Sequence, residues 1–222
     1  GEAARFDEAR AGVDEALSAF ERIARESPAS RRAQRDVWVA LHHRGDTGVR
    51  MARSESRGLG EAERAERQRA ASEAALEDFA RAADVARGLA ADEENVEAHR
   101  DLALCLNKQG NALLGLGRVE EAGRVYAESL AVRRALHAAD PTSRHAHDLF
   151  VGLVKAGEGA LAQADRLTSA EAVEAARGEA RGLFDEAWGV LRGLIDLGVH
   201  DAGSGEVREL RGLMERAGGS LP

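Results

Sequence analysis

The sequence predicts an all-α protein, built as an α-solenoid of antiparallel helix pairs. Ala, Glu, Arg and Leu, which all favour helices, dominate its 222 residues, whereas Ile, Thr and Tyr, which favour strands, are scarce. A helical pattern recurs along the chain with a spacing of 47 residues, from Asp101 to Asp148. The 24 glycines would weaken isolated helices, so we expect tertiary packing to hold them.

The repeat is clearest in the first helix of each predicted pair. The segment "AHRDLALCLNKQGN" (98–111) aligns with "RHAHDLFVGLVKAGE" (144–158). An earlier copy, "AQRDVWVALHHRGD" (33–46), places Asp36 and Gly45 on the same pattern. Such self-similarity is typical of repeat architectures. The matched positions of the two later copies are Asp101 and Asp148, Leu102 and Leu149, Leu106 and Leu153, Lys108 and Lys155, and Gly110 and Gly157.

Each copy is followed by a second helix in which a small residue precedes an aromatic residue by one turn. The small residue lets this helix approach its partner, while the ring fills the space beside it. Two markers that recur together predict a genuine structural repeat. The three pairs of residues are Ala75 and Phe79, Ala122 and Tyr126, and Ala180 and Phe184.

Residues 106–126 resemble a tetratricopeptide repeat, whose pattern is W-x₂-L-G-x₂-Y, then A-x₃-F, then P. The spacing of 47 residues exceeds the usual 34, and Pro141 lies beyond the expected proline position. The chain is therefore similar to the long-period repeats of kinesin light chains and of bacterial signalling proteins. This resemblance implies a right-handed superhelix that binds proteins. The matching residues are Leu106, Gln109, Gly110, Leu113, Gly117, Ala122 and Tyr126.

In chain order, the apolar spacing predicts an amphipathic helix over 3–26 that ends at Ser27-Pro28 and belongs to a partial repeat. A last helix near 204–217, with Ser204 as its N-cap, would cover the open end of the array. We expect residues 1–222 to form one helical repeat domain. Its parts are the partial repeat (1–28), three helix pairs (29–92, 95–139 and 142–198) and a capping helix (203–218).

Insertions distinguish the outer pairs from the middle one. The first pair carries "TGVRMARSESRGLGEAERAERQR" (47–69) between its helices, and the third carries a smaller insertion near 166–179. Mixed charges favour solvated helical extensions. Alternatively, four arginines form a basic patch for an acidic partner. These are Arg44, Arg50, Arg53 and Arg57.

Composition and motifs argue against several other functions. A formal net charge of −8 disfavours non-specific nucleic-acid binding, and no apolar run approaches the length of a membrane span. His42-His43 and His145-x-His147 lack the helical spacing of metal ligands, and Cys105 is expected in the core. No nucleophile or phosphate-binding motif is present. We therefore expect no enzyme activity, no metal and no cofactor.

The resemblance implies that the first helices of successive pairs line a concave groove. In the second pair the groove positions carry Asn107, Lys108 and Asn111. An asparagine amide can donate to a peptide carbonyl and accept from its N–H, and Lys108 could bind a carboxylate. The family's carboxylate clamp is only partly matched. The counterparts are His42, His43 and Asp46 in the first pair and Val154, Lys155 and Glu158 in the third.

These observations predict a protein–protein interaction scaffold that holds a peptide or a partner helix on a preformed surface. A single cysteine fits a reducing cytoplasm. The chain begins with Gly1 rather than Met, so we expect it to be part of a larger signalling or assembly protein, of a bacterial type. Two alternatives stay open: a homodimerisation module, or a domain that regulates an attached catalytic domain.

Overall fold

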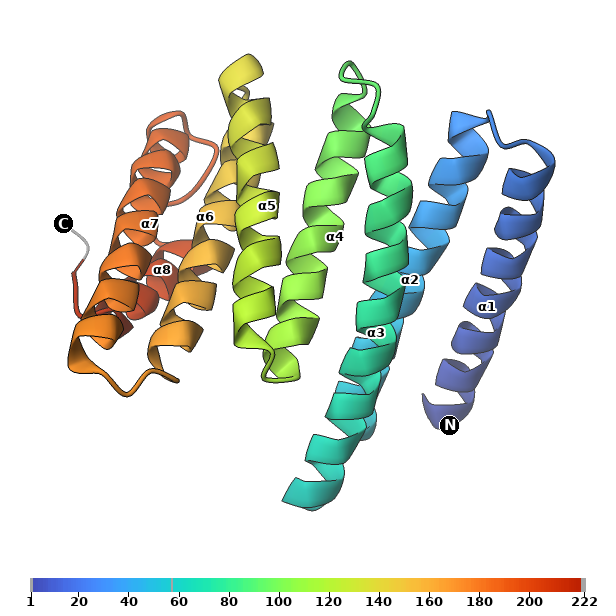
Figure 1. The fold of residues 1–222 in the computed structure, drawn as a ribbon, viewed down its shortest axis with the longest axis horizontal. Helices are drawn as coiled ribbons and strands as arrows, with labels where there is room; N and C mark the ends of the chain where they lie inside the picture. The colour runs from blue at the N-terminus through green and yellow to red at the C-terminus, as the bar shows by residue number, and fades with distance from the viewer. Residues whose placement is uncertain (1, 57, 221–222) are drawn as a thin grey trace. The chain divides into compact units, whose positions relative to one another are not determined.

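The computed structural model describes residues 2–56 and 58–220 (Figure 1). These residues form eight α-helices and no strand, so the all-α prediction is confirmed. The chain divides into two compact units, one up to Arg118 and one from Val119. The helices are α1 (Glu2–Glu26), α2 (Arg31–Glu55), α3 (Glu61–Leu89), α4 (Val96–Gly115), α5 (Val119–Ala139), α6 (Ser143–Ala164), α7 (Ala170–Asp196) and α8 (Gly205–Arg216).

Unit 1 contains α1 to α4, and each helix packs against the next in antiparallel order (Figure 1). The turn containing Pro28 ends α1, and the side chain of Ser30 caps α2 by accepting from the Ala33 amide at 3.2 Å. Asn95 caps α4 in the same way, accepting from Ala98 N. The core includes Trp38, Leu41, Phe79, Leu102 and Leu106.

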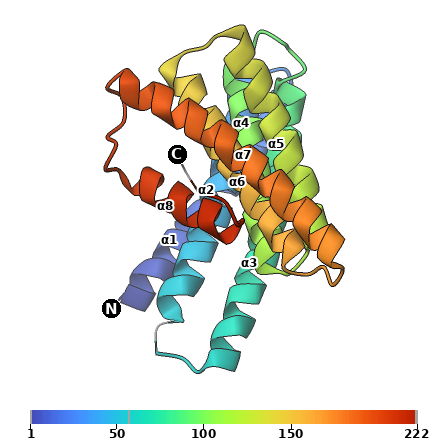
Figure 2. The ribbon, with the colours of Figure 1, turned by 90° about the vertical axis from the view of Figure 1, so that its left-hand side faces the viewer.

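Unit 2 contains α5 to α8. Its core spans all four helices, and α8 packs against α7 and α6 (Figure 2). Ser204 is the N-cap of α8, as the sequence predicts, and its hydroxyl accepts from the Val207 amide at 3.4 Å. Core residues of this unit include Tyr126, Leu153, Phe184, Leu191 and Leu210. The predicted pair 95–139 corresponds to α4 of unit 1 and α5 of unit 2.

The same glycine–aromatic contact joins the two helices of one pair in each unit. A Cβ atom placed on Gly45 of α2 would lie 2.9 Å from the ring of Phe79 in α3. A Cβ atom on Gly157 of α6 would lie 2.3 Å from the ring of Phe184 in α7. Both rings are buried. The glycine and aromatic markers of the first and third copies are therefore partners in space.

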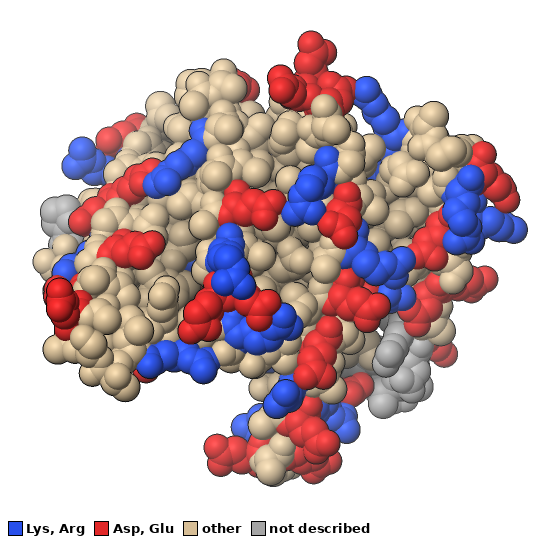
Figure 3. Space-filling view, viewed as in Figure 1, with Lys and Arg blue, Asp and Glu red and all other residues tan. Residues whose placement is uncertain are grey.

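The long insertion at 47–69 is mostly helical. Its helical parts are two arms, residues 47–55 at the end of α2 and residues 61–69 at the start of α3. Figure 3 shows acidic and basic side chains intermixed on the arms at the lower edge of the molecule. The smaller insertion forms the turn before α7 and its first turns. Over the described residues, no helix is both long and apolar enough to cross a membrane.

Candidate functional site

Side-chain interactions connect α2 with α4 in unit 1, so the first helices of the first two predicted pairs lie side by side. Arg35 Nε donates to Asp101 Oδ2 at 3.0 Å, and Lys108 forms an ion pair with Asp46. The indole N–H of Trp38 donates to the Cys105 sulfur at 3.1 Å. We name the surface beside these contacts the α2–α4 polar face. It consists of His42, His43 and Asp46 from α2 and Asn107, Lys108 and Asn111 from α4.

Lys108 already has a carboxylate partner within the chain. Burial raises the pKa of Asp46, but the hydrogen bond and the charge of Lys108 outweigh it, so the pKa falls below the ordinary value of 3.8. Both side chains remain partly exposed. The predicted contact between Lys108 and a partner carboxylate would therefore compete with Asp46.

Two buried polar atoms of this face lack a partner. Among the described residues, neither His42 Nε2 nor Asn107 Oδ1 makes a hydrogen bond. The His42 ring stacks on Trp38 with centroids 5.4 Å apart, and burial, followed by the charge of Lys108, lowers the pKa of His42. Asn107 is only 5% exposed, so a partner cannot reach it directly. His43 and Asn111 are the exposed members of the face.

The candidate residues of the third predicted pair lie in α6, within unit 2. Lys155 Nζ donates to Glu158 Oε2 at 2.6 Å, so these two charges neutralise each other. Val154 is buried and cannot contact a partner. The structure thus brings His42, Asp46 and Lys108 together in unit 1, and it pairs Lys155 with Glu158 in unit 2.

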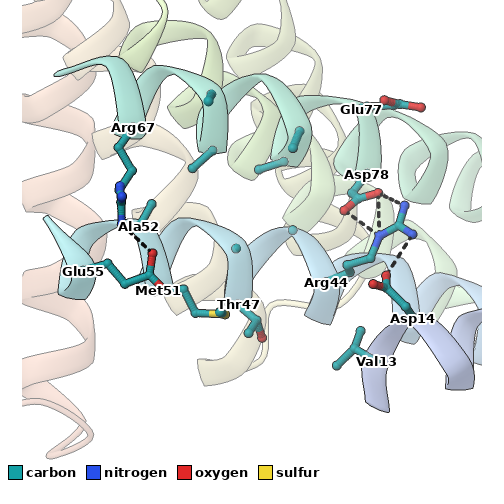
Figure 4. A pocket seen from close by; sticks show the side chains of 16 residues that line it. Val13, Asp14, Arg44, Thr47, Met51, Ala52, Glu55, Arg67, Glu77 and Asp78 are labelled. Carbon is teal, nitrogen blue, oxygen red and sulfur yellow. Dashed lines mark hydrogen bonds and ion pairs between the residues drawn. The ribbon is translucent and has the colours of Figure 1, made fainter. Parts of the chain in front are cut away.

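A separate hollow of about 530 Å³ lies between α1, α2 and α3, and we name it the arm groove (Figure 4). Small side chains on its α2 and α3 walls leave this volume open. No prediction from the sequence included this groove, although alanines at helical spacing on α3 opposite glycines on α2 were a usable signal. The small lining residues are Gly45, Gly48, Ala52, Ala70, Ala71, Ala74 and Ala75.

Charged side chains form the rim of the arm groove. Arg44 Nε donates to Asp78 Oδ2 at 3.0 Å, and its Nη1 donates to Asp14 Oδ1 at 3.4 Å (Figure 4). Arg67 donates to Glu55 at 2.9 Å between the two arms. With Glu77, the described lining residues hold four carboxylates against two guanidinium groups, a formal net charge of −2.

The predicted insertion patch is only partly available to a partner. Arg44 is engaged by Asp78 and Asp14, because α3 and α1 bring these carboxylates to its guanidinium. Arg50 and Arg53 are exposed, so the patch stays a prediction for them. Arg57 lies outside the described residues.

Cys105 is fully buried in α4, as its position between leucines predicts. Burial raises the pKa of its thiol to about 12, so the thiolate is scarce at neutral pH. This cysteine packs as a small apolar residue and is unsuited to nucleophilic chemistry.

Comparison with known proteins gives no further assignment. The sequence matches no protein-family model, and a search of curated proteins found no match.

Proposed function

We propose that this chain is a protein-interaction scaffold, a right-handed solenoid of the tetratricopeptide type that binds a peptide segment or a partner helix. The resemblance of residues 106–126 supports the repeat type. The glycine–aromatic contacts of the α2–α3 and α6–α7 pairs support a repeated architecture. Packed helices offer a preformed surface, which lowers the entropic cost of binding. In this proposal the chain works in the cytoplasm as part of a larger signalling or assembly protein.

The arm groove is the observation that carries the proposal. Its volume of about 530 Å³ lies within the range of ligand pockets, about 300–1,000 Å³. The alanine and glycine walls, with Met51, would accept one or two apolar side chains of a peptide. The net negative rim would favour Lys or Arg beside them. The occupant we propose is a short segment with apolar anchors and basic neighbours.

The α2–α4 polar face provides a second contact surface in this proposal. His43 and Asn111 are exposed there, and the Asp46–Lys108 pair offers one charge of each sign. A partner that passes over this face can exchange hydrogen bonds with all of these groups. Contacts on this face would orient the partner, and the arm groove would anchor its apolar side chains.

A peptide-display selection on the purified chain tests the proposal. Gly48→Leu is the blocking variant, because Gly48 lines the groove and has no atom within 4 Å of a Cβ placed on it. Gly182→Leu is the matched control, since Gly182 is exposed on α7 and equally uncrowded. We expect selected peptides to share apolar anchors next to Lys or Arg, and to bind Gly48→Leu at least tenfold more weakly than the control.

Two other results would change the assignment. Peptides that ignore Gly48→Leu, but are lost with His43→Ala/Lys108→Ala/Asn111→Ala, would place recognition on the α2–α4 polar face alone. A selection that enriches no peptide would contradict the peptide-binding proposal. A mass that rises with concentration in light scattering would then support the homodimer alternative.

A further inference from the structure

Three side chains that bind metals well meet in unit 2, where α8 packs against α6 and α7. His147 comes from α6, His200 from the segment between α7 and α8, and Glu206 from the first turn of α8. His147 Nε2 lies 3.1 Å from Glu206 Oε1, and His200 Nδ1 lies 2.7 Å from Glu206 Oε2. One ligand atom from each residue lies within 4.8 Å of the other two. We name these residues the His–His–Glu cluster.

The surrounding fold holds each member of the cluster in place. Glu206 directly precedes Val207, which is buried in the core of unit 2 and whose amide is bound by the Ser204 cap. The His200 amide donates to the Leu194 carbonyl at 3.3 Å. The His147 ring lies against Phe150, with centroids 6.2 Å apart. Three separate elements therefore converge on one point.

The two imidazoles are stacked, with centroids 5.1 Å apart and planes only 7° apart. Both rings also contact the carboxylate of Glu206. Two imidazole nitrogens and a carboxylate therefore meet at one place, which is a donor set that suits a divalent cation.

We infer that the His–His–Glu cluster binds a divalent transition-metal ion, Zn²⁺ foremost, through His147 Nε2, His200 Nδ1 and a Glu206 oxygen. Imidazole nitrogen and carboxylate oxygen are ordinary zinc ligands, at about 2.0–2.2 Å. Tetrahedral ligand atoms at that distance lie about 3.3 Å apart. His147 and His200 now contact different oxygens of Glu206, and one ligand atom from each residue lies within 4.8 Å of the other two, so the three side chains close around the ion by rotating toward it.

The exposure of the cluster suits an exchangeable ion. The side chains of His147, His200 and Glu206 are 39%, 17% and 33% exposed, which leaves a route for the ion from solvent. Three protein ligands occupy three positions of a tetrahedron, and water or a ligand from a partner takes the fourth. The bound ion joins α6 to α8, so it fastens the last helix onto its unit.

Zn²⁺ titration of the metal-free chain against a chromophoric chelator tests this site. We expect one tightly bound ion per chain, and at least tenfold weaker binding in His147→Ala, His200→Ala and Glu206→Gln. His43→Ala is the matched control, because His43 is an exposed helical histidine outside the cluster. Cobalt substitution should give visible d–d absorption in the wild type and the control, and lose it in the three variants. Far-ultraviolet circular dichroism verifies that each variant is helical.

Thermal unfolding supplies a second readout. An ion that binds only the folded chain raises Tm, so Zn²⁺ should raise the wild-type Tm and EDTA should reverse the rise. The rise should be absent in His147→Ala. Equal Zn²⁺ affinity in the wild type and Glu206→Gln, or no tight ion in the wild type, would overturn the proposal. The cluster would then be a carboxylate hydrogen-bonded to two histidines and nothing more.

Discussion

The α2–α3 pair of unit 1 and the α6–α7 pair of unit 2 share one contact and differ in what surrounds it. In each pair a buried phenylalanine lies against a glycine of the facing helix, Phe79 against Gly45 and Phe184 against Gly157. The two pairs differ at the residue directly before each of these glycines and phenylalanines. Arg44 and Asp78 form an ion pair in unit 1, whereas Ala156 and Leu183 pack against an apolar core in unit 2.

The divergence continues along the same helices. His42 and Gly48 of α2 correspond in the repeat to Val154 and Ala160 of α6, which are both buried apolar residues. The α6–α7 pair is covered by α8, whereas the α2–α3 pair leaves the arm groove open. Close approach of two helices therefore needs only the glycine and the ring. The positions beside them are free to carry charge and an open groove in one unit and a sealed core in the other.

The largest effect is expected from overpacking the shared contact between glycine and phenylalanine. Gly157→Ala places a methyl group 2.3 Å from the buried Phe184 ring, and overpacking of this kind costs about 1–3 kcal/mol, here near the upper end. Gly45→Ala should cost less, because the corresponding distance to the Phe79 ring is 2.9 Å. Chemical denaturation measures both free energies of unfolding.

Phe184→Leu provides the control for this comparison. If the clash is the cause, Gly157→Ala should cost less in the Phe184→Leu background than in the wild type, giving a coupling above about 1 kcal/mol. Strictly additive losses would show that Gly157 is required for another reason, and the equivalence of the two pairs would lose its basis.

A smaller loss is expected when the ion pair of unit 1 is broken from one side. The Asp78 side chain is 7% exposed, so Asp78→Leu removes a buried acceptor and leaves Arg44 with only Asp14, which should cost about 2 kcal/mol. The double variant Arg44→Ala/Asp78→Leu copies unit 2. It should recover most of the loss, because replacing both partners with apolar groups is often nearly neutral.

Denaturation of the two variants and the wild type decides this point. A double variant that is as unstable as Asp78→Leu alone would mean that the α2–α3 pair needs the charges themselves. Arg44→Ala in the wild-type background completes the cycle and measures the coupling between the two side chains.

The sequence could predict the shared contact because both of its members recur. Gly45 and Gly157 hold equivalent positions in the first helices, and Phe79 and Phe184 do so in the second helices. A repeated marker on each of two neighbouring helices is enough to infer that the markers meet. Composition, with its excess of helix-forming residues, correctly predicted the helical class, and the flanking leucines correctly predicted the buried position of Cys105.

The site residues were harder to predict, because they depend on the register between helices. Lys108 is bound by Asp46, 62 residues away, and this partner follows only from how α2 lies beside α4. The His–His–Glu cluster has the same origin. The spacing of His147 from His145 argues against a metal site, whereas its neighbour in space, His200, lies 53 residues later in the segment between α7 and α8. The arm groove is hard to predict from the sequence, because it arises where small side chains of neighbouring helices leave space unfilled.

A gain in stability is expected from Gly48→Ala, which gives α2 the residue that α6 has at position 160. No atom lies within 4 Å of a Cβ placed on Gly48, so the methyl group meets no clash. Alanine is favoured over glycine inside a helix by about 1 kcal/mol. The free energy of unfolding should rise by about that amount, and Gly182→Ala on α7 should show a similar gain. A loss at position 48 alone would mean that the groove wall moves closer in solution.

The subtlest difference between the pairs is a titratable ring where unit 2 has Val154. Burial, and then the charge of Lys108, lower the pKa of His42 below its ordinary value of 6.5. The unfolded chain therefore takes up a proton at this position before the folded chain does. The contribution of His42 to stability is complete above about pH 6.5 and declines as the pH falls toward its lower folded-state pKa.

His42→Val should remove that decline, because valine cannot bind a proton. The free energy of unfolding of the wild type should fall more steeply between neutral and mildly acidic pH than that of the variant. His43→Val is the matched control for the substitution itself, since His43 is adjacent and exposed. If the free energy of unfolding changed with pH equally in His42→Val and the wild type, the His42 ring that stacks on Trp38 would bind a proton as readily in the folded chain as in the unfolded chain. The polar face of unit 1 would then tolerate charge at a position that unit 2 keeps apolar.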